Sequence, residues 1–203
     1  RCRLVGSEMC IRDSYQSLID KDVFIATSLQ GITDNYHDLG NSQAAINYLN
    51  SYLDSHPDDL YAISLLVTQY SAENSQQSIE SAEKLLTTVL AKNPQWGEGQ
   101  LLLAKLYARQ EQWSKAISAG LKANTIPALK QALELQLLLA SSYEQLDDAS
   151  QAIEYYRAAL AIAPDYDAAA NNLALLLSAD ASKTDNLNAA LELALRFKHS
   201  RNP

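Results

Sequence analysis

The sequence contains little cysteine, glycine or proline, and it has no long apolar run. Its 203 residues include 2 Cys, 6 Gly and 5 Pro. Two cysteines at positions 2 and 10 are too few and too poorly spaced for a disulfide framework or a cysteine-based zinc site. So little glycine and proline excludes collagen-like and low-complexity chains. No run of about 18 uncharged apolar residues is present, so we expect no membrane-spanning segment in this chain.

Positive charge is also scarce. The chain has 16 Lys and Arg against 24 Asp and Glu, which gives a formal net charge of -8. Nucleic-acid binding requires clustered cations that neutralise phosphates, so we predict no nucleic-acid partner. A basic or a neutral partner is easier to accommodate on an acidic surface.

The residues that usually carry catalysis are missing or scattered. His37, His56 and His199 lie in unrelated parts of the chain, so no pattern brings them together as metal ligands or as a general base. No glycine-rich phosphate loop, serine-centred elbow or zinc-ligand spacing is present. The sequence therefore predicts a protein that is not an enzyme and that needs no cofactor and no metal.

The opening residues, RCRLVGSEMCIRDS, differ from everything that follows. They hold both cysteines and the only methionine of the chain. The stretch resembles the translated read-through of a sequencing adapter, so we predict that residues 1–14 are a non-native leader, the alternative being a disordered native N-terminus. Residues 15–25 are predicted to be an irregular lead-in. The cysteine-free remainder fits a bacterial periplasm or envelope as well as a cytoplasm, and it does not decide between them.

The few prolines are evenly spaced. Consecutive prolines are 37, 33, 37 and 39 residues apart, and each one follows a long helix-favouring stretch: Pro57, Pro94, Pro127, Pro164 and Pro203. Proline ends a helix because it lacks an N–H donor and its ring clashes with the preceding turn. A period in the mid-thirties is typical of stacked helix hairpins.

Other residues recur with the same period as the prolines. In LLLASSYEQLDDASQAIEYYRAALAIAP, residues 137–164, one helical face carries Leu139, Ala140 and Tyr143, and a second helix carries Ala152 and Tyr156. The polar turn Asp147-Asp148 separates the two helices and is expected to cap the second one. The pattern predicts five helix hairpins, near residues 26–59, 60–96, 97–129, 130–166 and 167–203.

Offsets of three and four residues place these side chains on one face of each helix. Small residues such as Ala140 and Ala152 allow two helices to approach closely, so Ala152 is predicted to be almost fully buried. The hydrophobic phase predicts an all-α fold with the following helix pairs: 24–37 with 42–54, 59–73 with 77–92, 96–109 with 113–124, 130–145 with 149–162, and 167–178 with 186–198.

These hairpin residues resemble those of the tetratricopeptide repeat family over about residues 26–203. The departures are an early tryptophan that is absent and Ala or Val where the family often has Gly, at Val67, Ala104, Ala140 and Ala174. The resemblance implies an all-α, right-handed superhelical solenoid of antiparallel helix hairpins that acts as a protein-interaction scaffold. Residues 152–177 and 186–203 are similar, more narrowly, to bacterial envelope proteins that accompany exopolysaccharide production and PEP-CTERM sorting. Such relatives continue with a further repeat, so a truncated C-terminus is expected.

The leading hypothesis is a scaffold that binds a partner protein or peptide in its concave groove. The alternatives are the non-catalytic arm of a larger enzyme or exporter, such as a glycosyltransferase or a polysaccharide secretion protein, and a spacer without a ligand. In a stack of hairpins the first helices line the concave face. Their groove positions are Tyr61, Ser64, Leu65, Thr68, Glu98, Leu101, Leu102, Lys105, Arg109, Glu134, Leu137, Leu138, Ser141, Gln145, Asn171 and Asn172.

Leucines in the middle of this set form a predicted apolar strip beside two cations, Lys105 and Arg109. Each of Leu102 and Leu138 is equally well interpreted as packing between repeats. Leucine and serine stand where relatives that bind a terminal carboxylate place Lys, Arg and Asn, so recognition of that kind is not expected. On second helices, Trp113 and Tyr155 are interpreted as packing residues rather than as ligands.

Overall fold

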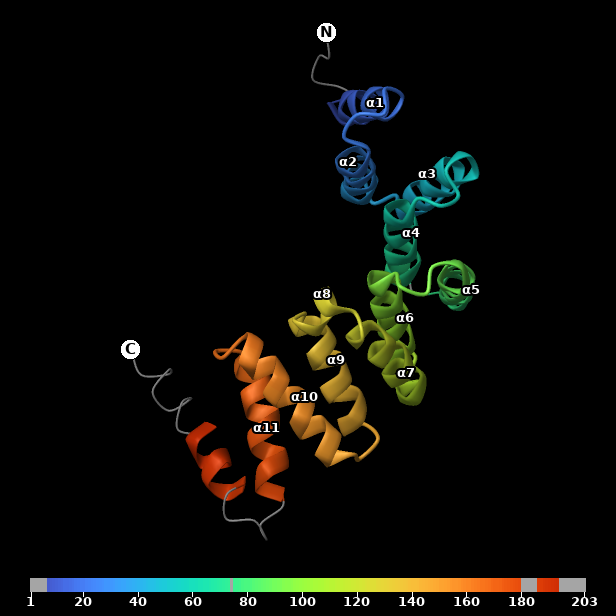
Figure 1. The fold of residues 1–203 in the computed structure, drawn as a ribbon. Coiled ribbons are helices and arrows are strands. Elements are labelled where there is room, and N and C mark those ends of the chain that lie inside the picture. Colours follow the sequence, from blue (N-terminus) through green and yellow to red (C-terminus); the bar gives the residue numbers. More distant parts are fainter. Residues whose placement is uncertain (1–6, 74, 180–185, 194–203) are drawn as a thin grey trace, which may run out of the picture. The chain divides into compact units, whose positions relative to one another are not determined.

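The computed structural model describes residues 7–73, 75–179 and 186–193 of the chain, and these residues form helices joined by turns, with no strand among them (Figure 1). The predicted all-α class is thus confirmed. By its internal contacts the chain divides into two compact units, Arg1–Asn93 and Pro94–Pro203. The division falls at the second of the evenly spaced prolines.

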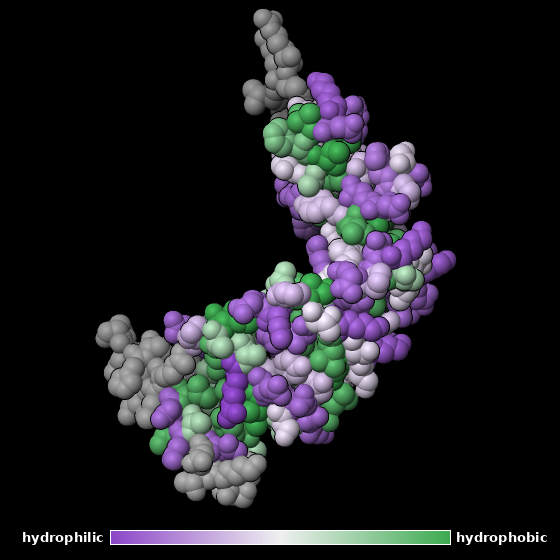
Figure 2. Space-filling view, in the orientation of Figure 1, coloured by the Kyte–Doolittle hydropathy of each residue, from purple (hydrophilic) through white to green (hydrophobic). Residues whose placement is uncertain are grey.

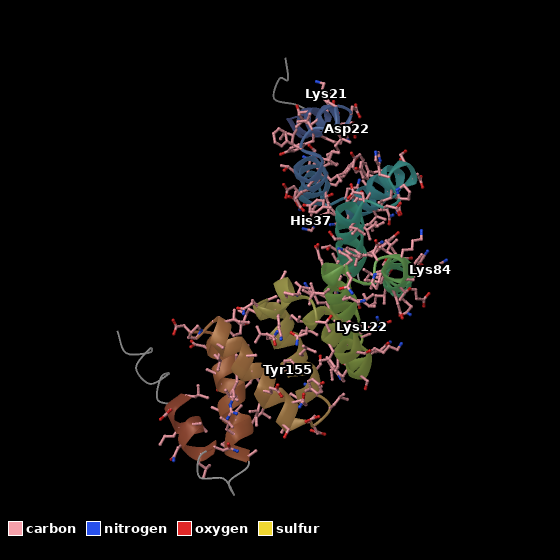
Figure 3. All side chains as sticks on the ribbon, viewed as in Figure 1. Lys21, Asp22, His37, Lys84, Lys122 and Tyr155 are labelled. Carbon is pink, nitrogen blue, oxygen red and sulfur yellow. The ribbon has the colours of Figure 1, made fainter. Side chains whose placement is uncertain are left out.

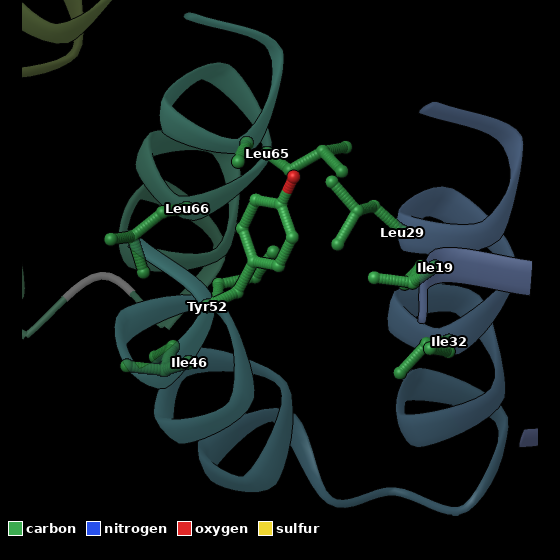
Figure 4. Close-up of a cluster of buried hydrophobic side chains, with 9 residues drawn as sticks. Ile19, Leu29, Ile32, Ile46, Tyr52, Leu65 and Leu66 are labelled. Carbon is green, nitrogen blue, oxygen red and sulfur yellow. The ribbon is translucent and has the colours of Figure 1, made fainter. Parts of the chain in front are cut away.

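The first unit is a series of helices in which each packs on the next. Contacts join α1 to α2, α2 to α3, α3 to α4 and α4 to α5, and α2 also contacts α4. Its core contains Ile19, Leu29, Ile32, Tyr52 and Leu66, which come from four of the helices and pack in one cluster (Figure 4). The helices are α1 (Ser7–Ile19), α2 (Ile25–Asp38), α3 (Ser42–Ser55), α4 (Leu60–Glu73) and α5 (Gln76–Lys92).

The second unit repeats the hairpin arrangement. The helix pairs α6 with α7, and α9 with α10, have the most extensive contacts, while α9 also packs on α6 and α7, and α11 packs on α10. Residues 186–193 are helical as well. The helices are α6 (Gly97–Arg109), α7 (Trp113–Asn124), α8 (Pro127–Lys130), α9 (Leu133–Glu144), α10 (Ala149–Ile162) and α11 (Asp167–Ala179).

The predicted helix pairs are confirmed to within a few residues over the described parts of the chain. The end of the last predicted helix, residues 194–198, lies outside the described residues. Two elements were missed, the N-terminal helix α1 and the short helix α8. Pro127 starts α8, since a proline ring holds φ near the helical value at the first position of a helix. Ile126 and Leu129 anchor it so closely to Gly97 that a Cβ there would lie 2.6 Å from Leu129 Cδ1.

The prediction for the N-terminal residues is wrong where it expects irregular or disordered chain, because Ser7–Ile19 form helix α1. This helix packs on α2, and Tyr15 lies so close to Gly31 that a Cβ on that glycine would be 2.4 Å from the tyrosine ring. Tyr48 also donates a hydrogen bond of 2.8 Å to Gln16. Contacts with later helices, which local composition does not show, stabilise this segment. The non-native origin of residues 1–14 stays a prediction.

The contact between α9 and α10 has the expected form. Ala140 and Ala152 both have 0% exposed surface and belong to one cluster with Tyr156 and Ala159, so the prediction for Ala152 is confirmed. The turn before α10 is also as predicted, because Asp148 caps the helix by accepting a hydrogen bond of 3.1 Å from the backbone N–H of Gln151. Small residues at the crossing and a carboxylate at the cap thus define this hairpin.

Candidate protein-interaction surface

In the second unit the predicted groove residues lie on the first helices of successive hairpins, α6, α9 and α11, apart from Gln145, which directly follows α9. Six of these residues are exposed at the surface: Glu98, Arg109, Glu134, Ser141, Gln145 and Asn171. We call the surface that they form the first-helix surface. Its six defining residues are all polar or charged. On the face drawn in the space-filling view, hydrophobic patches lie between hydrophilic residues (Figure 2).

One ion pair joins neighbouring first helices on this surface. Lys105 Nζ on α6 lies 2.7 Å from Glu134 Oε1 on α9, and the two side chains are 42% and 59% exposed. A pair as exposed as this contributes little to stability. It matters for recognition, because Lys105 is already neutralised. A partner that approaches Lys105 therefore also meets the carboxylate of Glu134.

The predicted leucine strip is narrower than the sequence pattern suggests. Leu101 is only 8% exposed and belongs to a core cluster with Leu135 and Leu139. Leu102, Leu137 and Leu138 are half-buried, and the last two also pack against core clusters. Since Leu101 is used to join α6 to α9, it is not an anchor for a partner.

The four predicted groove residues of the first unit all lie on α4. Two of them are buried and two are exposed. Ser64 is buried and its hydroxyl donates to the backbone oxygen of Tyr61 at 2.8 Å. Leu65 is 8% exposed and points into the core, where it lies near Leu29 (Figure 4). Tyr61, 38% exposed, and Thr68 remain at the surface. Ser64 and Leu65 are thus corrected from contact residues to packing residues.

Asn172 belongs to a hydrogen-bond chain between helices. Its side-chain amide donates to the hydroxyl of Tyr156 at 2.9 Å, and that hydroxyl donates to Glu144 Oε2 at 2.7 Å. Burial and the hydrogen bond to Glu144 raise the pKa of Tyr156 to about 12, against a smaller lowering by Asn172. The chain of hydrogen bonds connects α9, α10 and α11, so Asn172 helps to position these helices.

We expect Tyr156→Phe to lower the free energy of unfolding by about 1–2 kcal/mol at pH 7, because the hydroxyl joins two polar groups that would lose a partner. The raised pKa adds a pH dependence. Between about pH 10 and 12 the unfolded state has lost the proton that the folded state keeps, so stability falls as the pH rises through this window. Urea unfolding at pH 7 to 11.5 measures both effects. Equal slopes of free energy against pH for wild type and variant would contradict this role.

One exposed residue of the first-helix surface was not predicted. Leu175 on α11 is 61% exposed. It follows Ser141 by 34 residues and Lys105 by 70, so it occupies the same place in its helix as they do. The repeat period itself was the signal that could have found it.

The comparisons with known proteins agree with this geometry. The family model of the tetratricopeptide repeat matches residues 133–166, which include the hairpin of α9 and α10. No curated protein shows a significant match to the chain. Among the described residues, none of the helices has the length and hydropathy that crossing a membrane requires.

Solved structures resemble the chain over most of its length. PilF of Pseudomonas aeruginosa has a TM-score of 0.70 at 17% identity, covering 97% of this chain and 79% of that one. MamA of Desulfovibrio magneticus RS-1, from residue 41 to its end, has 0.69 at 13%, covering 88% and 97%. The tetratricopeptide protein TTC0263 of Thermus thermophilus has 0.63 at 18%, covering 85% and 92%.

The chain therefore has the fold of tetratricopeptide repeat solenoids, a class of helical scaffold. Within it, residues 133–166 carry the sequence of the repeat itself.

Proposed function

We propose that this protein is an interaction scaffold that binds a partner peptide, extended or helical, on the first-helix surface of its second unit. The observation that supports this most is the set of exposed side chains along α9 and α11, in which Ser141 and Leu175 occupy the same place in their helices. Ser141, Gln145 and Asn171 offer hydrogen-bonding groups, and Leu175 offers an apolar contact. The buried residues between them, such as Leu139 and Leu173, hold this set on rigid helices.

The energetics favour recognition by shape and hydrogen bonds rather than by charge. Covering an exposed leucine such as Leu175 stabilises a complex by roughly 25 cal/mol per Å² of apolar area. Because Lys105 and Glu134 neutralise each other, this pair adds no net charge to the centre of the surface. We therefore expect affinity for the partner to depend only weakly on salt.

A pull-down from the native host tests the surface. The variant Ser141→Arg/Leu175→Glu places a long cation and a carboxylate at two exposed positions, so it should remain folded and lose at least about nine-tenths of its captured partner, a loss of roughly 1.4 kcal/mol in affinity. Leu121→Glu is the matched control, since Leu121 is 38% exposed on the second helix α7. Capture of the same partners by all three proteins, with equal helicity by circular dichroism, would reject this surface and favour a spacer or another face.

The narrower proposal places this scaffold in bacterial exopolysaccharide or envelope assembly. It is supported by the likeness of residues 152–177 and 186–203 to envelope proteins of that type. The complete reading frame with its neighbouring genes tests it. Neighbours for polysaccharide export or protein sorting support the assignment, and a fused catalytic domain would replace it with the arm of a larger enzyme.

A further inference from the structure

The second unit also has a cleft that shares none of its lining residues with the first-helix surface. The cleft has a volume of about 580 Å³ and lies between the end of α7, the short helix α8 and the last turns of α10. Tyr155, Ala158 and Ile162 form one wall, while Asn124 and Gln136 form another. Its volume falls in the range of clefts that bind small ligands or single side chains.

The amide wall of this cleft is held in place by hydrogen bonds. Gln136 is 3% exposed, and its Nε2 donates to Asn124 Oδ1 at 3.0 Å and to the backbone oxygen of Lys130 at 3.1 Å. These bonds tie α7, α8 and α9 together. Because the wall is already ordered, a ligand would bind with little further loss of conformational freedom.

The opposite wall combines an aromatic ring with a negative charge. Tyr155 lies half-buried on α10 (Figure 3). Its ring stacks on that of Tyr143, with ring centroids 5.5 Å apart and an interplanar angle of 7°. Burial raises the pKa of Tyr155, and so does the charge of Glu154, which also lines the cleft. The Glu154 carboxylate and the Tyr155 ring therefore line the same cleft.

Two helix ends add further negative potential. Asn124 is the last residue of α7 and Ile162 is the last residue of α10, and both line the cleft. The C-terminus of a helix carries about half a negative charge from its free carbonyl groups, so cations are favoured there. Among the lining residues Glu154 is the one carboxylate and Lys130 the one cation, so their charges sum to zero and the helix ends supply the negative potential of the cleft.

We propose that this cleft binds one arginine side chain of a partner, with the guanidinium against the Tyr155 ring and paired with the Glu154 carboxylate. A guanidinium is planar and always charged, so it stacks on an aromatic face and binds a carboxylate through two N–H groups. The net charge of -8 draws such a ligand toward the chain. The site is separate from the first-helix surface.

Isothermal titration of the whole chain with capped pentapeptides, Gly-Ala-X-Ala-Gly, tests the proposal. The peptide with X as arginine should bind, the one with the uncharged isostere citrulline should bind at least about tenfold more weakly, and lysine should lie between them because it has no planar face. Glu154→Gln and Tyr155→Leu should each weaken the arginine peptide about fivefold, whereas Tyr155→Phe keeps the ring and should retain binding.

Controls separate this site from general attraction to an acidic protein. Glu192→Gln removes an exposed charge elsewhere, Tyr166→Leu removes a tyrosine that is 40% exposed, and Leu175→Glu alters the first-helix surface. All three should leave binding of the arginine peptide unchanged. Equal binding of arginine and citrulline peptides, no binding, or full affinity in Glu154→Gln would each overturn the proposal. If Tyr155→Leu loses helicity, the affinity of Glu154→Gln for the arginine peptide alone decides whether the proposal stands.

Discussion

Ala152→Arg should lower the free energy of unfolding by at least about 3 kcal/mol, through overpacking and the burial of a charge. Ala152 has no exposed surface and lies in one cluster with Ala140, where α10 crosses α9. A long cation has no space in that contact and no route to solvent without separating the helices. Thermal and urea unfolding measure the loss.

Ala161→Arg is the matched control, because Ala161 is exposed near the end of the same helix, where a cation suits the helix dipole. We expect its midpoint to stay within about a degree or two of wild type, since exposed substitutions change stability by about 0.5 kcal/mol or less. If Ala152→Arg behaved like this control, the register of α10 against α9 described above would be wrong.

Leu139→Ala should cost about 2–5 kcal/mol, because Leu139 is fully buried and its removal leaves a cavity. The side chain packs with Leu101, Ala123 and Leu135, which belong to three different helices. Leu139 also lies against Gly120 of α7, where an added Cβ would be 2.8 Å from Leu139 Cδ2. Urea unfolding gives the size of the loss.

A double-mutant cycle makes this second prediction specific. In the wild type, Gly120→Ala must push the end of Leu139 aside, whereas in the Leu139→Ala background the same methyl group enters the cavity. We expect Gly120→Ala to be about 1 kcal/mol more favourable in that background. Additive effects of the two substitutions would show that Gly120 and Leu139 are not in contact.

The first helix of each hairpin shows how far the repeat pattern predicts the candidate site. The pattern correctly places Ser141 and Asn171 at the surface, but it treats Leu101 and Leu65 in the same way although both are buried. Side chains at the same position of different repeats therefore differ in how far they are exposed. The difference depends on the side chains of the neighbouring helices, such as Leu135 and Leu139 beside Leu101.

For a related reason, the repeat pattern could not predict the polar contacts between helices. Lys105 and Glu134 are 29 residues apart, and Asn172 and Tyr156 are 16 apart, so neither pair follows from the spacing within a helix. Each depends on the rotamers of long side chains across a helix–helix contact. The cleft beside Tyr155 likewise depends on α8, an insertion that local composition marks only by Pro127.

By itself, the sequence determined the class of fold, the helices from α2 to α11 other than α8, and the burial of Ala152. These features follow from local periodicity, helix-breaking prolines and caps, which act within one or two turns of the chain. Only the tertiary structure decided that Ser7–Ile19 join the first core, that Leu101 is a packing residue, and that Lys105 is paired with Glu134. Those outcomes depend on which side chains of distant segments meet, because exposure and charge pairing belong to the contact between helices and not to either helix alone.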